Sequence, residues 1–282
     1  MPSLLPLLFV FLWSTGFIGA KFGLPYAEPL TFLLWRYALV VGLMLPIVVL
    51  TRAPWPKEPR QWLHIGITGV LVHGFYLGGV FMAIHQGLPA GVTALVVGLQ
   101  PLLTALAAGG LLGEQVLPRQ WLGLALGFLG VGLVVSGKLE AKAVGMLLPA
   151  LAALAGITLG TLYQKRFCAR FDLRTGSVLQ FVPAALCTLP VALATETMEV
   201  DWQGDFVFAL LWLVLVLSIG AISLLNLLIR QGSAVNVARL FYLTPPTTAL
   251  MAWALFGETL GLLALVGMGL AVAGVYLARG EA

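Results

Sequence analysis

The second half of this chain aligns with the first half, without a gap, after a shift of 144 residues. Between residues 89–133 and 233–277, about a third of the aligned positions are identical. Prolines and glycines take part in the match, for example Pro101 with Pro245, so a shared leucine-rich composition does not account for it. We therefore interpret the chain as two copies of one unit, which have to fold into two similar structures.

Long apolar segments recur through both copies. Of the 282 residues, 60% are hydrophobic and only 9% are charged, whereas an ordinary soluble domain carries about 25% charged residues. A membrane-spanning helix needs about 20 largely apolar residues. Ten segments meet this requirement, at residues 3–22, 30–51, 61–84, 88–112, 119–137, 144–165, 175–195, 206–229, 234–256 and 260–278. We therefore predict an all-α integral membrane protein with ten transmembrane helices, the first of which is not a signal peptide because no basic residue precedes it.

Each copy contains five of these segments, which divides the chain into an N-terminal repeat over residues 1–138 and a C-terminal repeat over residues 139–282. An odd number of spans makes the second repeat enter the membrane from the opposite side, so we predict two inverted five-helix repeats. Inverted repeats can rock around a central binding site between two near-equivalent arrangements, one open to each side of the membrane. This architecture is typical of transporters that work by alternating access.

The basic residues predict the orientation of the chain. With a cytoplasmic N-terminus, ten lysines and arginines fall on the cytoplasmic side, and only Lys21, Lys138 and Lys142 fall outside. Cytoplasmic loops carry such an excess, so both termini are predicted to be cytoplasmic. The net charge of +4 is explained in this way, and no basic face for nucleic acid is expected. The two cysteines, Cys168 and Cys187, suggest no disulfide.

Both repeats end in the same order of features: a proline within a span, a Gly-Glu pair and a glycine-rich last helix. These features are Pro101, Gly113-Glu114, Gly123 and Gly130 in the first repeat, and Pro245, Gly257-Glu258, Gly267 and Gly274 in the second. Together with Trp13-Ser14 and Trp35-Arg36-Tyr37, they resemble the drug/metabolite transporter superfamily, in particular its ten-helix EamA-type branch. The resemblance implies an inner-membrane exporter of small metabolites, and bacterial members of this branch include exporters of aromatic amino acids. Nucleotide-sugar transporters belong to the same superfamily, so the substrate class stays open.

Three prolines within predicted spans are candidates for gating. Pro101, Pro245 and Pro246 each remove a backbone hydrogen bond and free the carbonyl group four residues earlier. At membrane depth, a freed carbonyl has to be satisfied by protein, water or ligand. We expect these two helices, which the repeat relates to each other, either to bend around a central cavity or to carry simple packing kinks.

Arg239 lies within the ninth predicted span and aligns with a leucine in the first repeat. A buried guanidinium is costly unless it is paired, so one interpretation is that Arg239 holds a substrate carboxylate. The other interpretation is that its side chain snorkels to the cytoplasmic surface. Arg36 aligns with Gln180, and the resemblance places it on a helix outside the cavity, so a structural role is expected for it.

Aromatic and polar residues spread over several spans could form the wall of a substrate cavity. His73 and Tyr76 are one turn apart and share a helix face. The complete predicted substrate-binding set is Trp13, His73, Tyr76, Gln100, Tyr163, Asn226, Arg239 and Tyr242. An aromatic, mostly uncharged cavity favours a bulky, moderately apolar solute, with aromatic or neutral amino acids as the first expected substrates. The alternative is another solute class, either a nucleotide sugar or a hydrophobic amine.

All eleven Asp and Glu residues fall in predicted loops or at helix ends, so no mid-span carboxylate is available as a proton relay. We therefore predict gradient-driven, facilitated export, with a flux that persists when His73 is replaced by glutamine. No catalytic residue, cofactor or metal site is predicted, because no nucleophile, paired-carboxylate or ligand set has a useful spacing. A membrane enzyme or a channel is a less favoured alternative. The predicted partners are a small-molecule substrate and the lipid bilayer; a monomer suffices for transport, and the oligomeric state is left open.

Overall fold

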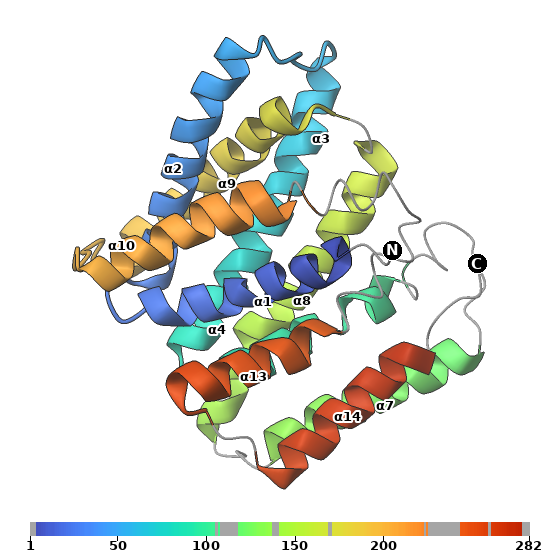
Figure 1. Ribbon diagram of the computed structural model, residues 1–282. Helices are drawn as coiled ribbons and strands as arrows, with labels where there is room; N and C mark the ends of the chain where they lie inside the picture. The colour runs from blue at the N-terminus through green and yellow to red at the C-terminus, as the bar shows by residue number, and fades with distance from the viewer. Residues whose placement is uncertain are drawn as a thin grey trace.

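The computed structural model describes residues 4–104, 107, 118–136, 141–168, 171–222, 224, 243–258 and 261–277. Within these ranges every regular element is a helix, and the one strand-like contact is an isolated bridge between Ala27 and Val200. Six of the helices are long and apolar enough to cross a membrane. The all-α prediction is therefore confirmed for the described residues (Figure 1), and these six helices are consistent with a multi-pass membrane protein.

Apart from the fourth, eighth and ninth predicted spans, which run into residues outside the described ranges, the helices end within about three residues of the predictions. The first half contains α1 (Leu5–Gly23), α2 (Pro29–Leu50), α3 (Pro59–Gly69), η1 (Val70–Leu77), α4 (Gly78–His85), α5 (Ala90–Val97) and α7 (Pro118–Ser136). The second half contains α8 (Ala141–Phe167), α9 (Leu173–Thr195), α10 (Gly204–Leu211), η2 (Trp212–Ala221), α13 (Thr244–Phe256) and α14 (Leu262–Leu277). Proline stands in the first turn of α1, α2, α3 and α13, where its missing N–H costs no hydrogen bond.

Two helices contain a π-helical segment. η1 lies between α3 and α4, and η2 continues α10. In a π-helix each N–H bonds the carbonyl five residues earlier, and such segments often occur at functional sites. The Tyr37 hydroxyl on α2 donates a hydrogen bond of 2.6 Å to the His73 carbonyl of η1. Hydrophobic patterning predicts a helix at both places but not its π-helical form.

α7 and α14 pack against each other at their backbones, and Figure 1 shows them side by side. A Cβ atom added to Gly130 would lie 2.4 Å from the Gly267 carbonyl oxygen, and one added to Gly274 would lie 2.4 Å from the Gly123 carbonyl oxygen. The later residue of one helix therefore meets the earlier residue of the other, so the pair is antiparallel. Glycine allows this close approach where lipid provides no hydrophobic drive for association.

α2 and α9 form a second antiparallel pair. At one end, the Glu196 carboxylate accepts hydrogen bonds of 2.8 and 2.7 Å from the N–H groups of Leu30 and Thr31. These bonds satisfy two of the donors that a helix leaves unpaired at its N-terminus. At the other end, the Thr175 hydroxyl donates to the Pro54 carbonyl at 3.0 Å. Polar contacts thus join the two helices at both ends of the pair.

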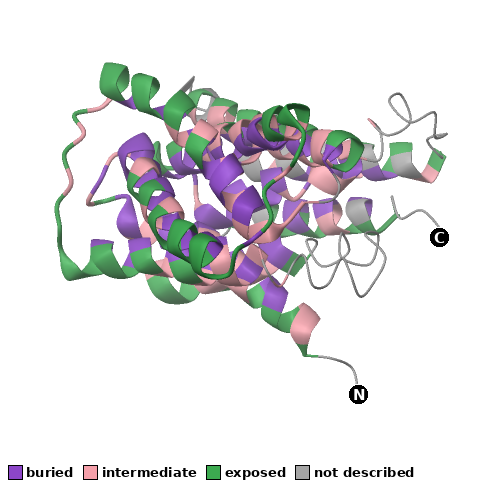
Figure 2. Ribbon diagram, turned by 90° about the horizontal axis from the view of Figure 1, so that it is seen from above, coloured by how far each residue is buried: buried purple, intermediate pink, exposed green. Residues whose placement is uncertain are grey.

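Helices of the two halves interleave at the centre of the bundle. Gly16 and Gly19 of α1 face Leu217 and Leu213 of η2, and α8 packs in a similar way on η1. Figure 2 shows buried residues on the inward faces of the helices and exposed residues on their outer faces. Large apolar side chains on the outer faces include Leu50, Leu186, Leu250, Trp253 and Leu262. A soluble monomer rarely exposes such extensive apolar surface, whereas in a bilayer these side chains face lipid.

The predicted gating prolines stand near the starts of helical segments. α5 ends at Val97, and a turn separates it from a short helical stretch over residues 100–104. The structure therefore has a break just before Pro101 where the sequence predicts a kink. Pro245 and Pro246 stand in the first turn of α13. A Cβ atom on Gly98 would lie 2.9 Å from Pro245 Cγ, so the two proline-bearing segments contact each other.

Candidate functional site

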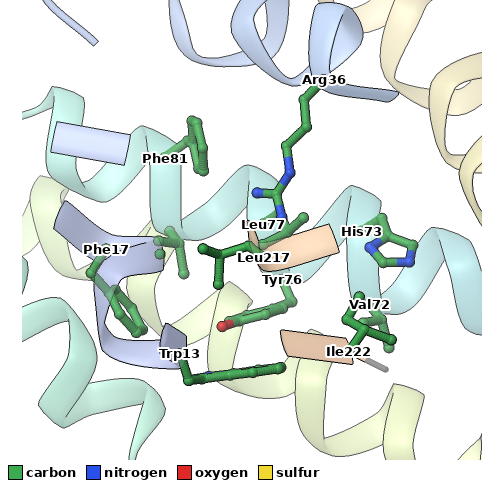
Figure 3. A pocket seen from close by; sticks show the side chains of 12 residues that line it. Trp13, Phe17, Arg36, Val72, His73, Tyr76, Leu77, Phe81, Leu217 and Ile222 are labelled. Carbon is green, nitrogen blue, oxygen red and sulfur yellow. The ribbon is translucent and has the colours of Figure 1, made fainter. Parts of the chain in front are cut away.

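A small cavity lies among α1, α2, the η1–α4 region and η2 (Figure 3). Its volume is about 60 Å³, which is room for several water molecules. Three members of the predicted substrate-binding set, Trp13, His73 and Tyr76, line it. The remaining lining residues are Gly16, Phe17, Arg36, Val72, Leu77, Val80, Phe81, Leu217 and Ile222. Among the described residues, the lining therefore combines aromatic rings with one arginine, and it draws on both halves of the chain.

His73 is positioned by α9. Its side chain is only 3% exposed, and its ring stacks on Phe181 with the ring centroids 3.9 Å apart. His73 Nε2 lies 3.3 Å from Gln180 Oε1. A carbonyl oxygen can only accept, so with the Gln180 amide oxygen assigned to this side, a neutral His73 ring carries its proton on Nε2 and has its acceptor at Nδ1. His73 Nδ1 is buried and has no hydrogen-bond partner in the structure, which is uncommon for a buried polar atom.

Arg36 also lines the cavity, so the prediction that it stands outside is wrong. The side chain is 5% exposed, and Figure 3 shows it extending from α2 toward the other labelled residues. Its Nε donates a hydrogen bond of 3.1 Å to Ser218 Oγ in η2. The prediction considered only where the helix lies, whereas a long arginine side chain carries its charge well away from its own backbone.

Arg36 and Gln180 occupy equivalent positions under the 144-residue shift. Each reaches a π-helical segment in the opposite half, because Arg36 contacts Ser218 in η2 and Gln180 contacts His73 in η1. The sequence contains a signal for this arrangement, since two long polar residues recur at the same place in otherwise apolar spans. Ser218 and Gln180 are the functional candidates that the sequence analysis missed.

Two other members of the predicted set do not line this cavity. Gln100 Nε2 donates to Thr161 Oγ1 at 3.1 Å, which links the short helical stretch at Pro101 to α8. The Tyr163 hydroxyl lies 2.7 Å from His64 Nδ1, in the middle of α3. Both side chains therefore have local hydrogen-bond partners on neighbouring helices.

Three further members lie outside the residues that the structure describes, namely Asn226, Arg239 and Tyr242. They belong to the segment that connects η2 to α13 along the chain. Their place in a substrate site stays a prediction.

A charged contact joins three helices at the end where α1 finishes. The Lys21 ammonium forms an ion pair with the Glu258 carboxylate and lies over the Phe256 ring, 4.8 Å from its centroid. Glu258 also accepts a hydrogen bond of 3.4 Å from the N–H of Ala90 at the start of α5. The Lys21 side chain is 30% exposed and that of Glu258 is 12% exposed. This Lys21–Glu258 contact therefore holds α1, α5 and the end of α13 together.

Curated proteins similar to this chain are transporters. A transporter from Bacillus subtilis (strain 168), YvbV, is 28% identical over 98% of this chain and 90% of its own length, and carries the description uncharacterized. The inner membrane transporter YedA of Escherichia coli (strain K12), also uncharacterized, is 27% identical over 94% of this chain and 86% of its own length. A probable amino-acid metabolite efflux pump of Salmonella typhimurium is 26% identical over 97% of this chain and 93% of its own length.

A solved structure and a family model also match this chain. A solved crystal structure matches with a TM-score of 0.67 and 21% identity, over 98% of this chain and 95% of that chain, which shows a shared fold. The family model described as EamA-like transporter family matches twice, over residues 2–136 and 144–280. These two matches cover almost the whole sequence, so the chain belongs to the EamA-like transporter family.

Proposed function

We propose that this membrane transporter exports aromatic or neutral amino acids by alternating access, down the gradient of its substrate. The observation that carries the proposal is the cavity itself. Trp13, Phe17 and Phe81 provide aromatic surface, and Arg36 and His73 provide polar groups, in one cavity that residues of both halves line. Transporters with internal repeats bind their substrates in such a place.

Two inverted repeats, over residues 1–138 and 139–282, are the proposed framework for alternating access. The separate family matches in each half support this division. A shift of 144 residues also takes α2 onto α9 and α7 onto α14, and both of these pairs are antiparallel. The same shift superposes the π-helical η1 on η2. Repeat-related helices that cross in opposite directions are what an inverted duplication requires.

Amino acids are the proposed substrates for two reasons. One relative is described as a probable amino-acid metabolite efflux pump. In addition, the cavity lining contains one arginine among the described residues, beside several aromatic rings, a combination that suits one carboxylate and a bulky side chain. The diphosphate of a nucleotide sugar calls for more than one cationic group, and a hydrophobic amine calls for none.

We further propose that the protein lies in the inner membrane with both termini in the cytoplasm. Cysteines introduced singly at Lys57 and Glu199, two exposed loop residues, should then react with an impermeant thiol reagent from opposite sides of the membrane, in a background that lacks Cys168 and Cys187. Lys57 should be labelled only from the cytoplasmic side, and Glu199 only from the outer side. Labelling of both positions from one side contradicts the inverted arrangement.

Transport is expected in proteoliposomes without any imposed ion gradient. Each Asp or Glu that the structure describes lies in a loop, at a helix cap or in a first turn, so no described mid-helix carboxylate can relay protons. Preloaded vesicles should show saturable counterflow of labelled phenylalanine or tryptophan, which neither a channel nor an enzyme would produce. Uridine diphosphate sugars and aromatic amines should compete weakly.

A substitution at His73 tests whether transport is coupled to protons. In His73→Gln, the maximal downhill flux should persist, because glutamine keeps a polar group but cannot titrate. Concentrative uptake driven by a pH gradient, and abolished by this substitution, would show that the transporter is proton-coupled. Counterflow of nucleotide sugars or amines in preference to amino acids would instead replace the proposed substrate class.

A further inference from the structure

Arg36 places a guanidinium group inside the bundle without a carboxylate partner among the described residues. Its side chain is 5% exposed, and its one hydrogen bond, from Nε to Ser218 Oγ, is to a neutral group. The acidic residues that the structure describes lie at helix ends and in loops, away from the middle of α2. An ionised group in such a place is costly unless an anion meets it, so the site calls for a negative charge from elsewhere.

The bond to Ser218 leaves the terminal nitrogens of Arg36 available. A guanidinium has five N–H donors in a fixed fork, and its two Nη groups match the two oxygens of a carboxylate. Ser218 engages Nε, which fixes the plane of the fork. Figure 3 shows the guanidinium group at the cavity, near Leu77 and Leu217.

An unpaired ring nitrogen on a second residue that lines the cavity provides a further, independent observation. His73 Nδ1 is buried without a hydrogen-bond partner, while Nε2 is engaged by Gln180. The residues that line the cavity therefore include a cationic donor from α2, a histidine from η1 with an unpaired ring nitrogen, and several aromatic rings. A molecule that satisfies both has a carboxylate and an ammonium group, which is the head of an α-amino acid.

We infer that Arg36 binds the carboxylate of the transported solute, with Ser218 orienting the guanidinium and His73 Nδ1 accepting a hydrogen bond from the ammonium group. This inference rests on the proposed transport of amino acids and assigns its specificity to Arg36 rather than to Arg239. Through this contact, Arg36 makes the transporter selective for zwitterions over amines of the same size.

The test compares three ligands that share one aromatic ring: L-phenylalanine, phenethylamine, which lacks the carboxylate, and 3-phenylpropionate, which lacks the ammonium group. Each competes against labelled tryptophan counterflow in proteoliposomes. For Arg36→Gln, the inhibition constants of phenylalanine and 3-phenylpropionate should rise at least tenfold, and that of phenethylamine should change little. The ratio of the amine constant to the phenylalanine constant should therefore fall about tenfold. Arg36→Lys should recover part of this ratio, because it restores the charge without the fork.

His73→Phe is the matched variant for the other end of the ligand, because a phenyl ring can keep the stacking on Phe181 but has no hydrogen-bond acceptor. Phenylalanine and phenethylamine should bind less tightly to it, and 3-phenylpropionate should be unaffected. Ser218→Ala should show a smaller form of the Arg36→Gln pattern.

An unchanged ratio in a folded Arg36→Gln protein, or a ratio that falls in Arg239→Gln instead, overturns the inference. Thermal stability of each variant, measured in detergent, separates loss of folding from loss of recognition, and Arg36→Lys supplies the folded variant if Arg36→Gln is unstable. If the unmodified protein shows no amino-acid counterflow at all, the proposed function fails. If it transports phenylalanine and the ratio is insensitive to Arg36, only the role of Arg36 fails.

Discussion

Replacing Gly130 with leucine is expected to separate α7 from α14 and to reduce sharply the yield of folded protein. The first added carbon would already lie 2.4 Å from the Gly267 carbonyl oxygen and 2.8 Å from the Ala271 nitrogen. Both are backbone atoms, so no rotamer change relieves the clash, and the two helices have to move apart. Overpacking a close contact costs about 1–3 kcal/mol. A whole leucine side chain at this contact should destabilise the protein by more than that range. The measurement is the monodisperse fraction by size-exclusion chromatography, together with the melting temperature in detergent.

The same helix pair provides matched variants. Gly274→Leu should behave like Gly130→Leu, because its added carbon would lie 2.4 Å from the Gly123 carbonyl oxygen. Gly269→Leu should be tolerated, since Gly269 lies on α14 with open space around its Cβ position and leucine favours the helix more than glycine does. Normal folding of Gly130→Leu, or equal damage from Gly269→Leu, would contradict the observed crossing of the two helices.

Removing the Lys21–Glu258 contact is expected to shift the transporter toward a state that is open at the end where α1 finishes, which we propose is the outer side. A partly exposed pair of this kind contributes about 1 kcal/mol, and a change of one to two kcal/mol alters a two-state ratio about 5–30-fold. In Glu258→Gln and Lys21→Gln, a cysteine introduced at Gly16, on the cavity wall, should react faster with an impermeant reagent added from outside. The rate of labelling is the measurement.

Two controls bear on this second expectation. The exchanged pair Lys21→Glu with Glu258→Lys should return the labelling rate toward that of the unmodified protein, because it restores the attraction. Arg174→Gln should leave the rate unchanged, since Arg174 pairs with Asp172 at the start of α9, two residues away in sequence, and joins no separate helices. Slower labelling in the single variants, or equal acceleration by Arg174→Gln, would show that the Lys21–Glu258 contact does not close this end.

The helical framework could be predicted from the sequence because the bilayer imposes its length on every span. Hydropathy alone places α2, α7 and α9 to within about two residues of their observed ends. The π-helical form of η1 and η2 could not be predicted in this way, because a change from four to five residues in the hydrogen-bond pattern leaves the hydrophobic content unaltered. Both segments are nevertheless where the cavity forms.

A cavity residue could be predicted from the sequence only where both its type and its position in the bundle favour a place in the cavity wall. His73 and Tyr76 share a helix face and Trp13 is an aromatic residue of the first span, and all three line the cavity. Gln100 and Tyr163 have the same character but meet Thr161 and His64 on adjacent helices, which sequence cannot show without the helix packing. Arg36 was misplaced because the resemblance locates its helix, whereas the charge sits at the end of a side chain that reaches Ser218.

The contact between α7 and α14 can form only after α14 has been synthesised, long after α7 has entered the membrane. The glycines that meet, Gly130 with Gly267 and Gly123 with Gly274, are separated by 137 and 151 residues along the chain. At about 5–20 residues per second, the glycine face of α7 is in the membrane for roughly seven to thirty seconds before its partner is made. During that interval the backbone groove at Gly123 and Gly130 of α7 lacks the helix that fills it in the folded protein.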